Sequence, residues 1–288
     1  AQVMSSNGIL SMTELPKSLT ILGAGAIGCE FAYVMNAFGV EVTLVELAQH
    51  ILPSEDSEAA AVVEQSFQKS GIDVRVNSCA KSLKIRKDGI EVLVEATGKE
   101  TKVKSEKVLV VFGRVPNSSG LGLEDLGIEL DARGYIPVGD YGKTSIDGIF
   151  AIGDVTNTPA LAHVASKEGE NVAEYLAGHA KKQKQVDTAL VPSAIYCEPQ
   201  LAGIGLREDQ AKCDGVDYIK SVFPYRGTGK AVAMDKTDGF VKILADAKSG
   251  EFLGAHIVGH NATELIHQLA LAQSSELLPE DISNMIHA

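Results

Sequence analysis

The N-terminal part of the chain alternates apolar and amphipathic segments. An apolar run at 19–22 precedes a glycine-rich turn, apolar residues recur at helical spacing over 26–38, and a second apolar run follows at 41–46. Gly39 is a typical helix stop. Strand, turn, helix and strand therefore fit within about 30 residues, which is the size of a βαβ unit.

The next segments continue this alternation as far as residue 112. We predict a helix from Ser54 to about Ser70, a strand at 72–76, an antiparallel meander over 79–105 and a buried parallel strand at 107–112. Together with the βαβ unit, this pattern predicts an α/β domain that contains an antiparallel insertion.

The middle of the chain predicts one further strand and one long helix. The apolar run at 148–152 is typical of a buried strand, and a helix is expected from about Pro159 to Leu176. The stretch 181–185 is polar without interruption, so we expect a domain boundary there.

The last third of the sequence predicts an α+β domain. Short strands are expected around 194–205, 216–223, 231–235, 239–245 and 251–258. One helix is expected at about 207–213, and two more close the chain. Asn261 and Glu264 have the spacing of a capping box at the start of the first closing helix.

Composition restricts the classes of function. The formal net charge of −12 argues against a nucleic-acid partner, because phosphate backbones require a basic surface. No apolar run approaches the roughly 20 residues that a membrane span requires, so no membrane association is expected. Cys29, Cys79, Cys197 and Cys213 lack the spacing of a metal site, and we interpret them as reduced thiols in a cytoplasmic protein.

The main chemical signal is Gly23-x-Gly25-x-x-Gly28, which follows a predicted strand and opens a predicted helix. Gly23 permits the tight turn, Gly25 lets a pyrophosphate approach the backbone, and Gly28 lets helix and strand pack closely. Ala26 and Ile27 complete the helix N-terminus, whose N–H groups attract phosphate. A dinucleotide site is therefore expected here.

Glu46 indicates which dinucleotide is bound. It ends the second strand, about 20 residues after the glycines, where an acidic residue binds a ribose 2′-hydroxyl. Residues 47–51 contain no Arg or Lys that could receive a 2′-phosphate. We therefore expect NAD rather than NADP.

Several further segments resemble the pyridine nucleotide–disulfide oxidoreductases. The matching segments are Gly113-Arg114-x-Pro116-Asn117, Ala151-Ile152-Gly153-Asp154, Leu161-Ala162-His163-x-Ala165, Gly239–Lys242 and Gly254–Gly259. They occur in the family's order and cover the chain from about residue 5 to its end. The resemblance is therefore specific.

This resemblance implies two cofactors, NAD and FAD, and a homodimer. It implies that Gly113 and Arg114 help to bind NAD and that Glu30 lies near the nicotinamide and flavin rings. It assigns FAD contacts to Gly153, Asp154, Leu161, Ala162, His163 and Ala165. It also implies four parts: 1–13 as a remnant of an upstream FAD domain, 14–117 for NAD, 118–185 as a second FAD-binding segment and 186–288 for dimerisation.

Two features of the family lie outside the sequence. Its redox-active Cys-x4-Cys pair belongs to a domain that precedes residue 1, and its histidine base would follow Ala288. His287 matches the first histidine of the closing motif, which is not the base. We therefore expect a fragment without catalytic residues of its own, Glu30 being a supporting residue, and expect this chain alone to be inactive.

Three functions remain open on this evidence. The ending Ile286-His287-Ala288 and the segment Phe223-Pro224-Tyr225 favour the branch that oxidises dihydrolipoamide with NAD+ and works with the lipoyl-bearing subunit of a 2-oxo acid dehydrogenase complex. The alternatives are a catalytically incomplete NAD-binding and dimerisation module, and a relative of mercuric reductase or of the NADH oxidases and peroxidases.

Overall fold

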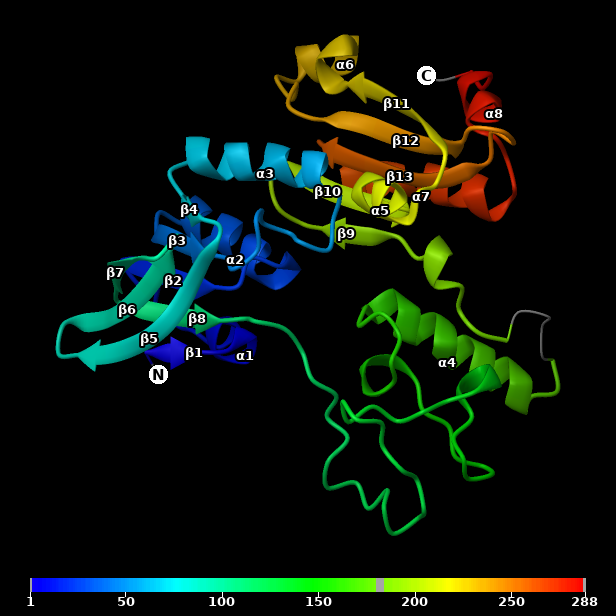
Figure 1. Cartoon of the computed structure of the whole chain (residues 1–288), viewed down its shortest axis with the longest axis horizontal. Coiled ribbons are helices and arrows are strands. Elements are labelled where there is room, and N and C mark those ends of the chain that lie inside the picture. The colour runs from blue at the N-terminus through cyan, green and yellow to red at the C-terminus, as the bar shows by residue number, and fades with distance from the viewer. Residues whose placement is uncertain (1, 180–183, 287–288) are drawn as a thin grey trace. The chain divides into compact units, whose positions relative to one another are not determined.

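The computed structural model describes residues 2–179 and 184–286, and it confirms an α/β fold with parallel and antiparallel sheets (Figure 1). The chain divides into two units: Ala1–Gly113 with Pro192–Ala288 form unit 1, and Arg114–Val191 form unit 2. Part of the expected boundary at 181–185, residues 181–183, lies outside the described residues, as does His287. The division into four parts remains a prediction.

The first sheet of unit 1 is parallel, with strand order β1–β8–β2–β3–β4. Its strands are β1 (Val3–Met4), β2 (Ser18–Leu22), β3 (Glu41–Val45), β4 (Asp73–Arg75) and β8 (Lys107–Val110). Because β2 pairs with β3 on one side and β8 on the other, the strand order reverses at β2. Ligands bind such sheets beyond the carboxyl ends of the strands at this reversal.

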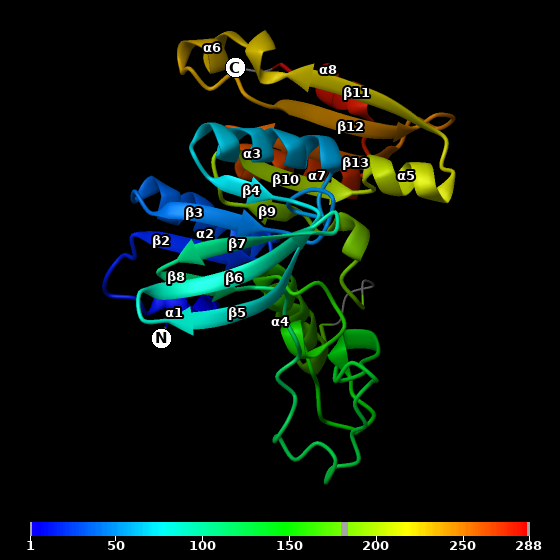
Figure 2. The ribbon, with the colours of Figure 1, turned by 60° about the vertical axis from the view of Figure 1, so that its left-hand side comes forward.

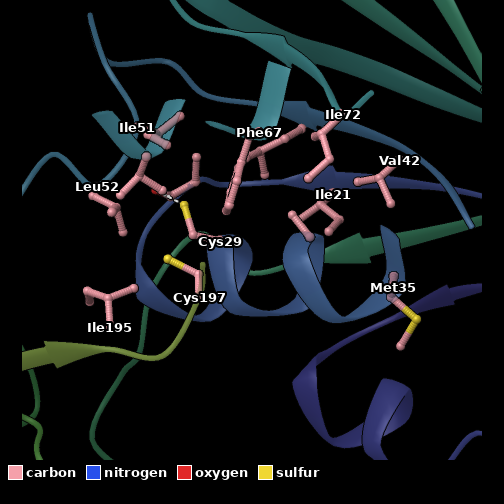
Figure 3. Close-up of a cluster of buried hydrophobic side chains, with 14 of the residues drawn as sticks. Ile21, Cys29, Met35, Val42, Ile51, Leu52, Phe67, Ile72, Ile195 and Cys197 are labelled. Carbon is pink, nitrogen blue, oxygen red and sulfur yellow. Dashed lines mark hydrogen bonds between the residues drawn. The ribbon is translucent and has the colours of Figure 1, made fainter. Parts of the chain in front are cut away.

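Helices α1 (Ser6–Leu10), α2 (Ala26–Ala37) and α3 (Ser57–Lys69) accompany this sheet. The apolar faces of α2 and α3 meet the strands in one core, in which Ile21, Cys29 and Phe67 are buried (Figure 3). The predicted helix at 26–38 is therefore confirmed, and so is the helix expected from Ser54, although it begins at Ser57 with Asp56 as its N-cap. Their apolar faces anchor both helices to the sheet.

The predicted meander is also confirmed. It consists of β5 (Ser78–Arg86), β6 (Gly89–Ala96) and β7 (Lys99–Ser105), paired antiparallel in that order. Ile90, Val92 and Val94 alternate along β6 and pack against the first sheet. This period of two places the other side chains of β6 on the opposite face.

The second sheet of unit 1 is antiparallel, with order β11–β12–β13–β10–β9. Its strands are β9 (Ser193–Ile195), β10 (Gln200–Gly205), β11 (Tyr218–Pro224), β12 (Phe240–Asp246) and β13 (Phe252–Gly259), and its helices are α5 (Glu208–Asp214), α6 (Gly229–Ala233), α7 (Ala262–Ser274) and α8 (Pro279–Ser283). Leu201 and Val258 share the core with α3, whereas Ala202 and Ile257 pack with α7. The sheet therefore lies between these two helices (Figure 2).

The described residues of unit 2 form α4 (Ala162–Leu176) and short 3₁₀ turns at Asp140–Gly142, Gly153–Val155 and Thr188–Leu190. Its own core contains Leu123, Ile128, Ile136 and Ala151. The rings of Tyr141 and Tyr175 stack with centroids 4.7 Å apart and hold α4 against the first of these turns.

Four local predictions are wrong. Residues 148–152 form no strand, and Phe150 makes only an isolated bridge with Lys143. Residues 229–233 form helix α6 in place of the strand expected at 231–235. Helix α4 begins at Ala162 rather than near Pro159. Asn261 precedes α7 in the left-handed conformation and makes no side-chain cap.

No helix within residues 2–179 and 184–286 is long and apolar enough to cross a membrane. The same ranges contain no group of three or more His, Cys, Asp or Glu residues arranged to hold a metal ion.

Candidate functional site

The glycine-rich turn joins β2 to α2 at the point where the strand order reverses. Gly23 has a φ of +106°, and its N–H donates to Val45 O at 2.9 Å, so the turn is tied to the neighbouring strand. A Cβ at Gly23 would lie 2.5 Å from Val111 O. Only glycine meets both the positive φ and this close approach.

Gly25 and Gly28 serve different purposes in this turn. A Cβ at Gly28 would lie 1.9 Å from Gly23 O, so the start of α2 packs directly on the turn. A Cβ at Gly25 would have no heavy atom within 4 Å, which leaves the backbone open to a ligand. Ala26, which is exposed, and Ile27 follow as the first residues of α2, where N–H groups lack intrahelical partners.

Glu46 follows β3 and lies beside this turn. Its Oε2 accepts from Ala24 N at 2.7 Å, and its Oε1 accepts from Ala48 N at 2.8 Å. Each carboxylate oxygen can accept a second hydrogen bond, and the residue is half-buried. The carboxylate is therefore held beside the turn and can still accept hydrogen bonds from two hydroxyl groups.

Glu30 lies on α2, one turn after its start, and is half-buried. Its Oε1 accepts from the backbone N of Tyr196 at 2.9 Å. Ser193 Oγ donates to Glu55 Oε2 at 2.8 Å, and Ser66 Oγ donates to Glu198 O at 3.2 Å. The segment 193–198 thus fixes the orientation of α2 and α3, a role that no local pattern in the sequence signals.

Gly113 ends unit 1 with a φ of +144°, and Arg114 begins unit 2. The Arg114 guanidinium forms an ion pair with the Asp154 carboxylate, and both side chains are partly exposed. The sequence assigned these two residues to different cofactors. The structure brings their side chains together in unit 2.

Asp154 lies in a short turn that begins at Gly153, whose φ is +68°. A Cβ at Gly153 would lie 2.9 Å from the Ala165 side chain, so the turn packs tightly on α4. Glu168, which the sequence did not indicate, accepts from Gly153 N at 2.7 Å through its Oε2. This contact fixes the peptide beside Asp154.

The predicted FAD contacts at 161–165 lie at the N-terminus of α4. Leu161 is the N-cap residue and makes no side-chain cap, while Ala162 and His163 are exposed in the first turn. The N-terminal end of a helix favours an anionic or carbonyl group of a ligand. Unit 2 therefore brings Gly153, Asp154 and the residues at 161–165 together on one turn and one helix end.

A buried ionic cluster joins α3 to the second sheet. Lys242 on β12 is 0% exposed, and its Nζ lies 2.8 Å from Asp56, 2.8 Å from Glu58 and 2.9 Å from Glu208. Burial alone would lower the pKa of Lys242, but these carboxylates outweigh it and raise the pKa. The cluster is structural, and its members lie too far apart in sequence for local patterns to signal it.

Comparisons with known proteins cover the whole chain. A family model of pyridine nucleotide-disulphide oxidoreductases matches residues 1–169, and the dimerisation-domain model of the same family matches 191–288. Dihydrolipoyl dehydrogenase of Corynebacterium glutamicum is 43% identical over 94% of the chain and 59% of its own length. That of Geobacillus stearothermophilus is 40% identical over 100% and 60%. The chain thus spans about three-fifths of these relatives.

Solved structures agree in fold. The HOCl-induced flavoprotein disulfide reductase RclA of Escherichia coli superposes with a TM-score of 0.90 at 28% identity, over 100% of this chain and 65% of its own. LpdA of Mycobacterium tuberculosis gives 0.89 at 30% identity, over 99% and 61%. Sequence, fold and the glycine turn agree, and the chain belongs to the pyridine nucleotide–disulphide oxidoreductase family.

Proposed function

We propose that this chain is the dinucleotide-binding and dimerisation part of a dihydrolipoyl dehydrogenase, an NAD- and FAD-dependent oxidoreductase that converts dihydrolipoamide and NAD+ to lipoamide and NADH. The single observation that carries the proposal is the Gly23–Gly28 turn with Glu46 held beside it. The relatives named dihydrolipoyl dehydrogenase, matched over nearly the whole chain, support it.

The residues of unit 1 fit NAD. The open backbone at Gly25 and the N–H groups of Ala26, Ile27 and Gly28 would hold the pyrophosphate, and the Glu46 carboxylate would accept from the adenosine ribose hydroxyls. Glu30, oriented by the Tyr196 N–H, is proposed to lie near the nicotinamide. The family resemblance assigns Gly113 and Arg114 to NAD as well; Gly113 ends this unit, whereas Arg114 belongs to unit 2, where its guanidinium pairs with Asp154.

The residues of unit 2 fit part of FAD. Asp154 would accept from the ribityl hydroxyls, and the start of α4 at Leu161, Ala162, His163 and Ala165 would face the flavin, with Gly153 letting the turn of Asp154 pack closely on α4. When bound, FAD would supply the redox chemistry that links a dithiol to the nicotinamide ring of NAD, while the protein binds and orients both cofactors.

We propose three further properties of the protein. It forms a homodimer through its second sheet, which matches the dimerisation domain of the family. It serves the lipoyl-bearing subunit of a 2-oxo acid dehydrogenase complex, as the names of its relatives suggest. It acts in the cytoplasm, where unpaired cysteines such as these stay reduced.

Calorimetric titration of the 288-residue chain with NADH and with NADPH tests the proposal. We expect NADH to bind at least about tenfold more tightly, because a 2′-phosphate would approach the Glu46 carboxylate. In Glu46→Ala this preference should disappear. The matched control is Glu41→Ala, at the exposed start of the same strand, which should keep it. Equal binding of both nucleotides by the parent chain would contradict the assignment to NAD.

A further inference from the structure

Tyr196 directly follows β9 and contacts the helix that the glycine turn opens. Its backbone N–H donates to Glu30 Oε1 at 2.9 Å, so the residue lies beside the Glu30 carboxylate. Both residues belong to unit 1, although they are 166 positions apart in sequence. The second sheet therefore places one aromatic residue next to α2.

The side chain of Tyr196 is not part of the core beneath it. Its neighbours Ile195 and Cys197 are each 3% exposed and belong to the core cluster that includes α2 (Figure 3). Tyr196 between them is 62% exposed, so its side chain points away from this core. Its hydroxyl makes no hydrogen bond with any residue in the described ranges 2–179 and 184–286. The ring is therefore free to contact a ligand.

Glu30 and Tyr196 lie one helical turn beyond the proposed pyrophosphate site. Ala26 is the exposed first residue of α2, and Glu30 follows it by four residues. Residues four apart share one face of a helix and are separated by about 6 Å along its axis. Because Glu46 is assigned to the adenosine half, the half of the dinucleotide that extends along this face is the nicotinamide half.

We propose that Tyr196 is a nicotinamide-binding residue, whose ring packs against the nicotinamide ring beside Glu30. This inference rests on the proposed function, because it takes the ligand of the glycine turn to be NAD. Aromatic rings attract each other in offset or edge-to-face geometry, and the face of a tyrosine ring also attracts a cation. A tyrosine ring beside a carboxylate therefore matches the cationic nicotinamide of NAD+ as well as the neutral ring of NADH.

The nucleotide site is then built from two distant parts of the chain. The glycine turn, Glu30 and Glu46 come from residues 1–113, whereas Tyr196 comes from the part that matches the dimerisation-domain model. Neither the glycine motif nor the family resemblance assigned a cofactor contact to any residue after Ala165. Tyr196 is therefore an addition to the site that the sequence predicted.

The test compares nucleotides with and without the nicotinamide ring. The full 288-residue chain and its Tyr196→Ala variant are titrated calorimetrically with NADH, NAD+ and ADP-ribose, which lacks nicotinamide. We expect Tyr196→Ala to bind NADH and NAD+ about three- to tenfold more weakly, because one ring contact is lost. The affinity for ADP-ribose should stay within about twofold of the parent value, since the backbone N–H that orients Glu30 remains.

Two further variants serve as controls. Tyr196→Phe keeps the ring and removes only the hydroxyl, so it should bind all three nucleotides within about twofold of the parent chain. Phe38→Ala removes an aromatic side chain of similar exposure, 67%, at the end of α2 and about 12 Å farther along the helix than Glu30. It should leave the three affinities unchanged.

The proposal is overturned if Tyr196→Ala binds NADH and NAD+ as tightly as the parent chain. It is equally overturned if the variant loses NADH and ADP-ribose affinity in parallel, because the residue would then support the whole site rather than the nicotinamide. An equal loss in Tyr196→Phe would rule out the ring as the binding group. A parent chain that binds none of the three nucleotides would instead refute the proposed function, and this inference with it, so the two failures are distinguishable.

Discussion

Gly28 brings the first turn of α2 against the carbonyl of Gly23, with 1.9 Å between that oxygen and the site a Cβ would occupy. In Gly28→Ala the helix must move away from the turn. We expect the free energy of unfolding to fall by about 1–3 kcal/mol and the affinity for NADH to fall at least about tenfold. Urea unfolding and calorimetric titration measure the two effects.

Gly25→Ala is the matched control for this prediction, because its Cβ would meet no atom within 4 Å. It should change the free energy of unfolding by less than about 1 kcal/mol while still weakening NADH binding, since the added methyl would lie where we propose that the pyrophosphate approaches. A Gly28→Ala protein as stable as the parent would show that the turn and the helix do not pack as described.

Lys242 pairs with three carboxylates inside unit 1, two of which, Glu58 and Glu208, also pair with Lys220. Replacing it by methionine leaves Asp56 and Glu208 buried and without their shared cation, so we expect a loss of about 3–5 kcal/mol in the free energy of unfolding. Lys236→Met removes an exposed pair with Glu198 and should cost less than about 1 kcal/mol. Equal effects of the two variants in urea unfolding would contradict this account of the cluster.

The elements that the sequence predicted correctly are those with a long or repeated pattern. Apolar residues at helical spacing predicted α2, and period-two alternation predicted β6. The predictions that failed concern short segments. Residues 148–152 are apolar, but Ala151 N donates to Gly142 O in a turn rather than to a neighbouring strand. In α6, Val232 is exposed and Ala231 is buried, and five residues carry too little periodicity to distinguish helix from strand.

Strand β13 carries a buried histidine that makes stability depend on pH. Burial lowers the pKa of His256 below its usual value of 6.5, and the positive charges of Lys242 and Arg207 act in the same direction. A hydrogen bond between its Nε2 and Leu206 O and the charge of Asp56 raise the pKa, but by less. The unfolded chain binds a proton below about pH 6.5 while the folded chain does not. The stability gained by keeping His256 neutral in the fold is therefore fully present above about pH 6.5, and it is lost as the pH falls toward the pKa of the folded state.

His256→Asn should make the urea-unfolding free energy less dependent on pH between about 7.5 and 5.5, because the differential protonation is removed. His260→Asn, on the loop after β13, should retain the dependence of the parent chain. Identical slopes for the parent and His256→Asn would show that another group controls stability in this range.

At the scale of the whole molecule, the sequence predicted the position of the candidate site, but not the contacts that hold its residues in place. Gly23, Gly25, Gly28 and Glu46 were recognisable because their spacing is local and follows the strand and helix. The Glu168 contact with Gly153 and the Tyr196 contact with Glu30 join residues 15 and 166 positions apart. Such contacts depend on how the elements pack, which no local pattern encodes.

Dimerisation is the prediction that belongs to the whole molecule. β11 is an edge strand of the second sheet, and its Ile219 and Phe223 are 58% and 55% exposed. Exposed apolar side chains gathered on a domain matched to a dimerisation family favour a protein interface.

In Phe223→Glu, a charge would have to be buried on association. We therefore expect the parent chain to sediment as a dimer and Phe223→Glu to associate at least about tenfold more weakly. Ile85→Glu, which changes an equally exposed residue of β5, should leave association unchanged. A monomeric parent chain at micromolar concentration, or equal weakening by both variants, would show that β11 does not carry the interface.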